Sequence, residues 1–181
     1  MSSVEFELEA IETLKSHLEL LEAKKVLLVT GKSSYKKSGA KKIIENLGGD
    51  LEFVRFAEFD DNPNIFDVEK GVQIFKKNKS GCVLAIGGGS SIDMAKLIKF
   101  FAPKKKPFQS EFDTKLSSDD DIPFIAIPTT AGTGSEATHF AVVYVGLEKY
   151  SISDPLLLPD HVAIISRLHF SQTKYQKAVS G

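Results

Sequence analysis

Strand-length apolar runs alternate with segments of helical periodicity along this chain, and that alternation constrains the fold more than any other feature. Four such runs occupy residues 25–31, 51–56, 82–86 and 122–128. As a set they are continuously apolar instead of apolar at every second position, which is typical of parallel strands that are covered on both faces. We therefore expect an α/β fold with an open, mostly parallel sheet and helices on both faces.

Helical periodicity appears before the first strand and between the strands. Within residues 4–24, apolar side chains recur at helical spacing and predict an amphipathic helix, with the apolar positions at Leu8, Ile11, Leu14, Leu18 and Leu21. Further helices are predicted over residues 38–49, 65–79 and 90–101, and a Ser/Lys-rich turn before residue 38. The polar residues 102–121, with their lysine run 104–106 and aspartate run 119–121, are predicted to form a solvated loop.

Length and charge narrow the class of protein. A chain of 181 residues with 42% hydrophobic residues can bury one core, so we expect residues 1–181 to form a single domain. Its 23 basic and 24 acidic residues nearly cancel, which argues against nucleic acid or an anionic membrane as a partner. Because the N-terminus is acidic and no run of about 18 apolar residues occurs, we expect neither a signal peptide nor a membrane span.

The chain contains a single cysteine, Cys82, at the start of an apolar strand-length run. It cannot form an internal disulfide, and its setting predicts a buried thiol instead of a reactive one. This cysteine usage fits a reducing cytoplasm, which is the location that we expect.

Three glycines and two serines separate an apolar strand from a helix in the sequence AIGGGSSIDMAK, residues 85–96. In open α/β sheets, ligands bind at the carboxyl ends of the strands, where this loop falls. The glycines at positions 87–89 would let the backbone approach a phosphate, while Ser90 and the first helical amides would donate hydrogen bonds at the positive end of the helix dipole. The pattern predicts an anion cradle, and a purely structural turn is the alternative.

Two standard phosphate-binding fingerprints do not fit this sequence. The dinucleotide pattern GxGxxG would need a glycine where the chain has Ile92, and the Walker pattern around TGKSS would need one where it has Val26. The glycine loop by itself therefore does not identify a dinucleotide site, and the polar loop that follows the next strand must be considered with it.

A second polar loop follows the next predicted strand, in the sequence IAIPTTAGTGSEAT at residues 125–138. Pro128 ends the strand because it has no amide hydrogen to donate. Hydroxyl side chains then follow at Thr129, Thr130, Thr133 and Ser135, with glycines at 132 and 134 between them. Two cradles at the ends of neighbouring strands can hold the two halves of a long phosphorylated molecule such as a dinucleotide.

The two loops, followed by ISDPLLLPD at residues 152–160, resemble the iron-containing (group III) alcohol dehydrogenase family. The resemblance covers most of residues 24–181. It implies a Rossmann-like N-terminal domain of the dehydroquinate synthase type, with a small β-hairpin, that binds NAD or NADP. It further implies an all-helical second domain, after residue 181 and absent from this chain, that holds a divalent metal, Fe or Zn, with one Asp and three His. KAVSG at residues 177–181 is similar to the segment that precedes this second domain.

Carried over to this chain, the resemblance implies a set of cofactor-binding residues. Gly88, Gly89 and Ser90 would hold the pyrophosphate, with Asp93 supporting the loop. The remaining members would be Gly31 beside the adenosine ribose, Asn62 on the adenosine side, Thr129, Thr130, Thr133 and Thr138 along the cofactor, and Lys149 at the nicotinamide ribose. Simpler interpretations stay open: Asp93 as a helix N-terminal charge, Asn62 as a turn residue before a proline, and Lys149 as a solvated lysine.

No catalytic residue and no metal ligand is expected within this chain. Its four histidines, at positions 17, 139, 161 and 169, show no HxxxH pair or carboxylate-flanked spacing. His139 follows the threonine-rich loop, and EATHFAVVY is similar to the phosphonoacetaldehyde reductase branch of the family, which reduces an anionic aldehyde. This similarity suggests a phosphonate-bearing substrate.

The function implied is that of the cofactor-binding half of a metal-dependent NAD(P) alcohol dehydrogenase or aldehyde reductase. Such an enzyme transfers a hydride between nicotinamide and a small alcohol or aldehyde, with the metal polarising the carbonyl oxygen, and we expect the complete protein to be a homo-oligomer. The alternatives are a stand-alone nucleotide-binding module and an enzyme related to glycerol-1-phosphate dehydrogenase or dehydroquinate synthase.

The sequence VTGKSS at residues 29–34 bears on the choice of cofactor. NAD-preferring members of the family that the chain resembles commonly carry Asp at the end of the first strand, where it would repel a 2′-phosphate. This chain has Gly31 there, followed by Lys32, Ser33 and Ser34, which can contact a phosphate. NADP is therefore favoured over NAD.

Overall fold

A computed structural model describes residues 3–21, 24–47, 51–104 and 121–171 of the chain. The strands are β1 (Ser3–Phe6), β2 (Lys25–Thr30), β3 (Glu52–Phe56), β4 (Cys82–Gly87), β5 (Phe124–Pro128), β6 (Phe140–Val145), β7 (Glu148–Ser153) and β8 (His161–Ile164). The helices are α1 (Glu7–Leu20), α2 (Ser34–Lys37), α3 (Ala40–Asn46), α4 (Ile65–Asn78) and α5 (Gly89–Phe101), with short 3-10 helices η3 (Ser135–Ala137), η4 (Pro155–Leu157) and η5 (Ser166–Ser171).

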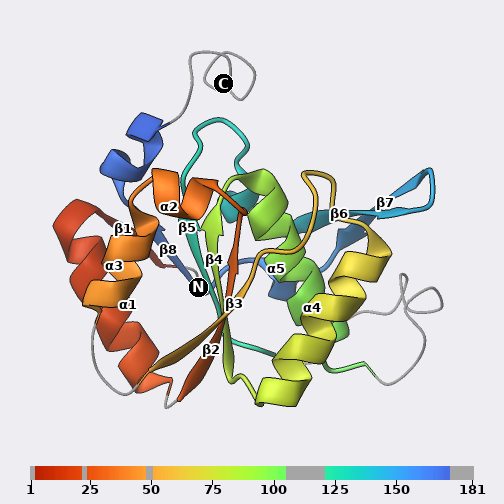
Figure 1. Cartoon of the computed structure of the whole chain (residues 1–181), viewed down its shortest axis with the longest axis horizontal. Coiled ribbons are helices and arrows are strands. Elements are labelled where there is room, and N and C mark those ends of the chain that lie inside the picture. The colour runs from red at the N-terminus through yellow and green to blue at the C-terminus, as the bar shows by residue number, and fades with distance from the viewer. Residues whose placement is uncertain (1–2, 22–23, 48–50, 105–120, 172–181) are drawn as a thin grey trace.

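One parallel sheet organises the described part of the chain, with six strands in the order β1-β8-β5-β4-β2-β3. Helices α1 and α3 lie on one side of it, and α4 and α5 on the other (Figure 1). The expected α/β fold with a mostly parallel sheet and helices on both faces is confirmed. The carboxyl ends of β2, β4 and β5 lie together at one edge of the sheet, where they can share a ligand site.

The central strands are buried because both faces of the sheet are covered. Along β2, Leu27 and Val29 belong to the core beneath α4 and α5, whereas Val26 and Leu28 belong to the core beneath α1 and α3. Successive side chains of a strand point to opposite faces, so a strand between two cores must be apolar at every position. This requirement explains the continuous apolar runs in the sequence.

Strand β3 is the exception among the predicted strands, because it lies at the free edge of the sheet. Glu52 and Arg55 are exposed, and only Phe56 is fully buried. An edge strand has one neighbour and tolerates charged side chains, which is why LEFVRF is the least apolar of the four runs.

The structure corrects the predicted secondary structure at three places. Residues 4–6 were predicted to be helical but form β1, which pairs with β8 from Val4↔Val162 to Phe6↔Ile164. Strand β8 was not predicted, and α2 forms where a turn was predicted. The apolar residues of β1 and β8 recur at spacings that also suit a helix or a loop, and the strand conformation follows from pairing, of β8 with β5 and of β1 with β8.

A separate antiparallel hairpin of β6 and β7 projects beside α4 (Figure 1), which confirms the expected small β-hairpin. The backbone amide of Tyr144 donates to the carbonyl of Pro63, at 2.9 Å, and ties the hairpin to the chain just before α4. The side chain of Asn64 caps α4 by accepting a hydrogen bond from the amide of Asp67, at 2.9 Å. The bond to Pro63 and an isolated bridge between Asn64 and Tyr144 hold the hairpin beside the start of α4.

Three further predictions concern the thiol of Cys82, the polar loop 102–121 and the absence of a membrane span. Cys82 is buried, as predicted, and burial raises the pKa of its thiol to about 12, so it is not a nucleophile at neutral pH. The predicted loop 102–121 lies mostly outside the described residues, and the segment 177–181 lies entirely outside them. Within the described ranges, no helix combines the length and the hydropathy that crossing a bilayer requires.

His161 lies at the start of β8, fully buried, and its ring stacks on that of His17 from α1 with centroids 4.3 Å apart. Burial, with a smaller contribution from His17, lowers the pKa of His161 to about 4. An unfolded histidine titrates near its ordinary value of about 6.5, so between these pH values the unfolded chain binds more protons than the native one. Stability must therefore fall as the pH drops through this interval.

We predict that His161→Phe flattens the pH dependence of stability between pH 6.5 and pH 4. The stacked ring is kept, but the proton uptake that costs the native state up to about 3 kcal/mol at the acid end is removed. Urea unfolding at several pH values measures the slope. His139→Phe, at a partly exposed histidine, is the matched control and should keep the wild-type slope; equal slopes in the wild type and His161→Phe would contradict the assignment.

Candidate functional site

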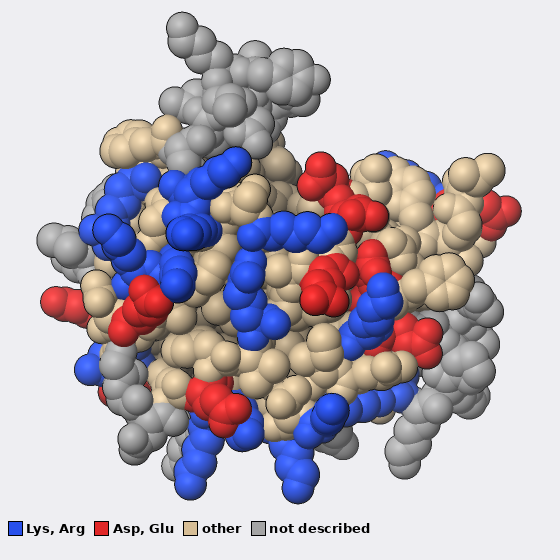
Figure 2. Space-filling view, viewed as in Figure 1, with Lys and Arg blue, Asp and Glu red and all other residues tan. Residues whose placement is uncertain are grey.

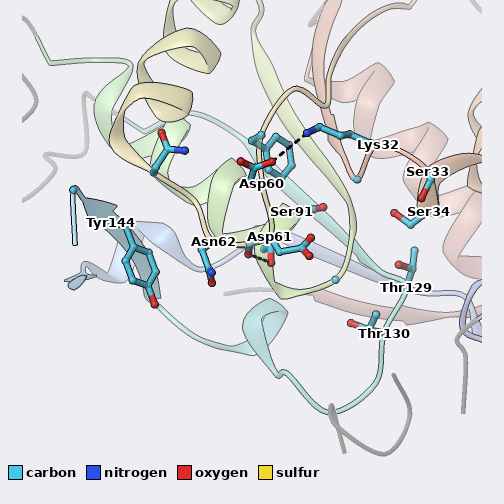
Figure 3. A pocket seen from close by; sticks show the side chains of 16 residues that line it. Lys32, Ser33, Ser34, Asp60, Asp61, Asn62, Ser91, Thr129, Thr130 and Tyr144 are labelled. Atoms are coloured by element: carbon cyan, nitrogen blue, oxygen red, sulfur yellow. Dashed lines mark hydrogen bonds and ion pairs between the residues drawn. The ribbon is translucent and has the colours of Figure 1, made fainter. Parts of the chain in front are cut away.

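A cleft of about 1020 Å³ opens at the carboxyl edge of the sheet, where β2, β4 and β5 end (Figure 3). Its walls come from four loops and from the β6–β7 hairpin. The lining residues are Gly31, Lys32, Ser33, Ser34, Phe59, Asp60, Asp61, Asn62, Asn64, Gly88, Ser90, Ser91, Thr129, Thr130, Tyr144 and Gly146. Most of these residues are small or polar, which suits a phosphorylated ligand better than an apolar one.

The glycine turn between β4 and α5 forms the floor of the cleft. A Cβ atom on Gly87 would lie 2.4 Å from Ser91 Oγ and 2.7 Å from Ser91 Cβ, so only glycine lets α5 begin this close to the strand. Gly88 is the N-terminal cap of α5 and has φ −81° and ψ −171°, an extended conformation open to any residue. No side chain caps the helix at this end, and the amides of Ser91 and Ile92 donate to the carbonyl of Gly88, so the amides of Gly89 and Ser90 are the ones left for a ligand in the cleft.

Thr130, just after β5, faces this turn. Its Oγ1 atom is buried, and within the described residues it has no hydrogen-bond partner. A Cβ atom on Gly88 would come within 3.0 Å of that oxygen and 3.2 Å of Thr130 Cγ2. A buried hydroxyl without a partner is costly, so one beside an uncapped helix terminus indicates a place for a ligand oxygen.

The loop between β3 and α4 forms the opposite wall of the cleft. The hydroxyl of Ser90 donates to the backbone carbonyl of Asp61 in a short hydrogen bond that joins this loop to the start of α5. Asn62 and Tyr144 point into the same opening from the loop and from the hairpin (Figure 3). The cleft is thus closed on one side by a loop that is held in place by the helix terminus.

The turn after β2 is held by Arg55, which extends from β3. Its Nε donates to Thr30 Oγ1 at 2.8 Å, and its Nη2 donates to the carbonyls of Gly31 and Lys32, each at 3.1 Å. The guanidinium also lies over the ring of Tyr35, 4.9 Å from the centroid. Arg55 therefore fixes the backbone of the turn and adds a positive charge beside the cleft.

Charged side chains face one another across the mouth of the cleft. Lys32 Nζ lies 3.2 Å from Asp60 Oδ1, in an exposed ion pair. Figure 2 shows basic side chains gathered on the side of α1 to α3 and acidic ones nearer α4. The solvent screens such a pair, so Lys32 can exchange Asp60 for an anionic ligand at little cost.

The structure brings together part of the predicted cofactor-binding set. Six of its members line the cleft: Gly31, Asn62, Gly88, Ser90, Thr129 and Thr130. Gly89 and Thr133 lie just behind them, since a Cβ on Gly89 would be 3.4 Å from Thr133 Cβ. The other three, Asp93, Thr138 and Lys149, are not among the lining residues.

Those three residues have other surroundings. Asp93 accepts a hydrogen bond from the amide of Val142 at 3.3 Å, and Thr138 Oγ1 accepts one from Lys96 Nζ at 3.2 Å. Burial raises the pKa of Asp93, although the neighbouring ammonium of Lys96 opposes the shift. Lys149 is exposed on β7, opposite Tyr144 in the hairpin register.

Sequence reasoning missed several residues of the site. Asp60, Asp61 and Tyr144 line the cleft, and Arg55 braces it, but none belongs to a recognisable motif. Lys96 and Lys99 lie in the apolar helical sequence MAKLIKFF. Lysines between apolar helical positions were the available sign in the sequence that a cation would be buried. A charged residue amid apolar helical positions must find a buried partner.

A metal site is not found in the described part of the chain. No group of three His, Cys, Asp or Glu side chains there is arranged to hold an ion. His139 packs its ring against Phe140 and does not line the cleft.

Comparison with known proteins agrees with this arrangement. The sequence model described as iron-containing alcohol dehydrogenase matches residues 2–166. The chain belongs to the iron-containing alcohol dehydrogenase family. It is 34% identical over 178 residues to choline dehydrogenase of Bacillus subtilis, covering 95% of this chain and 44% of that protein. It is 32% identical over 182 residues to a long-chain primary alcohol dehydrogenase of Thermoanaerobacter ethanolicus, covering 93% of this chain and 45% of that protein.

Solved structures of this family superpose on the chain. NADH-dependent butanol dehydrogenase A of Thermotoga maritima gives a TM-score of 0.89 at 26% identity, covering 99% of this chain and 46% of that one. Sulfoacetaldehyde reductase of Bifidobacterium kashiwanohense, solved in complex with NAD+, gives 0.87 at 27% identity, covering 99% and 48%. The chain therefore spans about half the length of the family members that it matches.

We predict that Gly88→Val weakens dinucleotide binding and leaves the fold intact. Because φ is negative at Gly88, the new side chain costs no backbone strain, but it fills the space between Thr130 and the start of α5. We expect a loss of about 1 to 3 kcal/mol in binding free energy, with a smaller loss for Gly88→Ala. Calorimetric titration with NADH and NADPH measures it, and circular dichroism controls for folding. Unchanged affinity in folded Gly88→Val would remove the turn from the binding site.

Proposed function

We propose that this chain binds a nicotinamide dinucleotide in the cleft at the carboxyl edge of its sheet, as the cofactor-binding half of a metal-dependent alcohol dehydrogenase or aldehyde reductase. The observation that carries the proposal is the buried hydroxyl of Thr130 beside Gly88 and the uncapped start of α5. A phosphate oxygen there would satisfy the hydroxyl and lie at the positive end of the helix. The NAD+ complex of sulfoacetaldehyde reductase is a precedent in a structure with the same fold.

The roles of the cleft residues follow from their chemistry. Gly88, Ser90 and the first amides of α5 would hold the pyrophosphate, with Thr129 and Thr130 completing the cradle from β5. The remaining predicted residues, Gly89, Asp93, Thr133, Thr138 and Lys149, are proposed to support or extend this site. When bound, the dinucleotide supplies or accepts a hydride at its nicotinamide ring. The chain itself would orient the cofactor and exclude water from one side of it.

We further propose that the cofactor is NADP in preference to NAD. Gly31 follows β2 without a carboxylate that would repel a 2′-phosphate, and the turn carries the cation of Lys32 and is held by that of Arg55. Asp60 opposes this preference, since its ion pair with Lys32 must open for a phosphate to take its place. Because that pair is exposed, we expect it to open readily.

The metal and the substrate are proposed for a complete protein rather than for this chain. The described residues do not provide a metal site, so an Fe or Zn ion would require ligands from elsewhere. Small alcohols or aldehydes are the proposed substrates, and the likeness to sulfoacetaldehyde reductase supports an anionic aldehyde, including a phosphonate-bearing one. A homo-oligomer and a cytoplasmic location remain part of the proposal.

We predict that residues 1–181 alone have no dehydrogenase activity, even with Fe or Zn supplied. No group of three His, Cys, Asp or Glu side chains in the described part of the chain is arranged to hold the metal that would polarise a carbonyl oxygen. The assay follows NADH and NADPH absorbance with a panel of alcohols and aldehydes, with a buffer blank and a metal-free sample as controls. Metal-dependent turnover clearly above both controls would refute the proposal that catalysis needs metal ligands from outside this chain.

We predict that Gly31→Asp shifts the dinucleotide preference strongly toward NAD. The carboxylate would accept hydrogen bonds from the ribose hydroxyls and repel a 2′-phosphate, a repulsion of roughly 4 kcal/mol at 4 Å and an effective dielectric of 20 before screening. The new Cβ would meet Ser34 Oγ at 2.2 Å, and this hydroxyl can rotate away. The ratio of the dissociation constants for NADPH and NADH is the measurement.

Gly31→Asn is the control for any disturbance of the turn itself: it adds a side chain of the same size without the charge, so it should shift that ratio much less than Gly31→Asp does. An unchanged ratio in Gly31→Asp would mean that Gly31 does not face the ribose.

A further inference from the structure

Helix α5 carries a lysine, Lys96, whose side chain is fully buried although no carboxylate forms an ion pair with it within 4 Å in the described residues. Its ammonium instead donates to backbone carbonyls of the segment that follows the threonine-rich loop: Ser135 at 2.6 Å, Thr138 at 2.5 Å and Phe140 at 2.9 Å. The chain between η3 and the first residue of β6 is therefore folded around this one cation.

We infer that Lys96 is a positioning residue for the cofactor, because its ammonium holds the loop between β5 and β6 against the glycine turn. This inference rests on the proposed dinucleotide site. Ser135 lies at the centre of the connection: its carbonyl binds Lys96, and its Oγ lies 3.2 Å from where a Cβ of Gly89 would be. Through Ser135, the cation and the turn that faces the pyrophosphate contact the same residue.

Asp93, one helical turn earlier on α5, also holds this segment. Together with the hydrogen bonds of Lys96 it anchors the chain between β5 and β6 to the helix. It accepts the amide of Val142 from β6, and it is the largest favourable charge acting on Lys96, followed by Glu136 of η3. Burial nevertheless lowers the pKa of Lys96 to about 8. The neutral amine has two hydrogens for four acceptors, so the anchor weakens as the pH rises through about 8.

Lys99 provides a matched control on the same helix. It is also buried, but it pairs with Asp121 at 2.8 Å and Asp160 at 3.8 Å. Asp160 accepts the amide of Phe124, the first residue of β5, so this pair lies at the amino end of the strand, away from the cleft. Removing either lysine disturbs a buried charge, but of the two only Lys96 contacts the loop between β5 and β6.

The test compares Lys96→Met and Lys99→Met in the 181-residue chain, titrated with NADH and NADPH at pH 7. Both variants should lower the thermal midpoint. We expect Lys96→Met to weaken nucleotide binding at least tenfold, and Lys99→Met to stay within twofold of the wild type. Wild-type affinity in folded Lys96→Met, or an equal loss in Lys99→Met, would overturn the inference and leave the proposed function standing. No binding by the wild-type chain would overturn the proposed function and this inference with it.

A second measurement decides the matter even if Lys96→Met does not fold. Nucleotide affinity of the wild-type chain should fall at least threefold between pH 7 and pH 9.5. In Asp93→Asn, which keeps an acceptor for Val142 but removes the charge that favours the ammonium, the fall should occur at lower pH. A flat wild-type profile, or identical profiles for the two proteins, would overturn the inference.

Discussion

The burial of helix α5 is the constraint on which the rest of the structure depends. It packs on β4, and nearly every residue from Ser91 to Phe101 is buried. A helix buried on all sides cannot leave a cation unsatisfied, because an uncompensated charge in the interior is very costly. Its two lysines therefore bind the chain at opposite ends of the sheet, Lys96 at the loop after β5 and Lys99 at the start of that strand.

The same packing creates the cleft. For α5 to start directly against β4, Gly87 must lack a side chain, since Ser91 occupies the space that a Cβ would need. The helix terminus that results has no capping side chain and faces Thr130 across a gap bounded by Gly88. A feature needed for packing thus leaves hydrogen-bond donors exposed at the carboxyl edge of the sheet, where anions bind in this class of fold.

Much of the central architecture could be predicted from the sequence because its cause is local to each strand. Strands β2, β4 and β5 have two buried faces and are therefore apolar throughout, and the glycine-to-helix transition after β4 is visible in the order of residues. The strands β1 and β8, on one side of the sheet, could not be predicted in the same way. β1 and β8 are short, and each pairs with a strand that is distant in the sequence, β8 with β5 and β1 with β8.

The sequence by itself determined the fold class, the two polar loops and the resemblance to the iron-containing alcohol dehydrogenases, because each rests on residue types at fixed spacing. Only the tertiary structure decided which polar residues share one cleft. Asp60 and Tyr144 reach it from a loop and from the hairpin, and Arg55 of β3 holds the turn beside it, whereas Thr138, within the second motif, binds Lys96 instead. Spacing fixes the position of a residue along a strand or helix, but contacts between elements distant in the sequence depend on how those elements pack, and packing alone selected these partners.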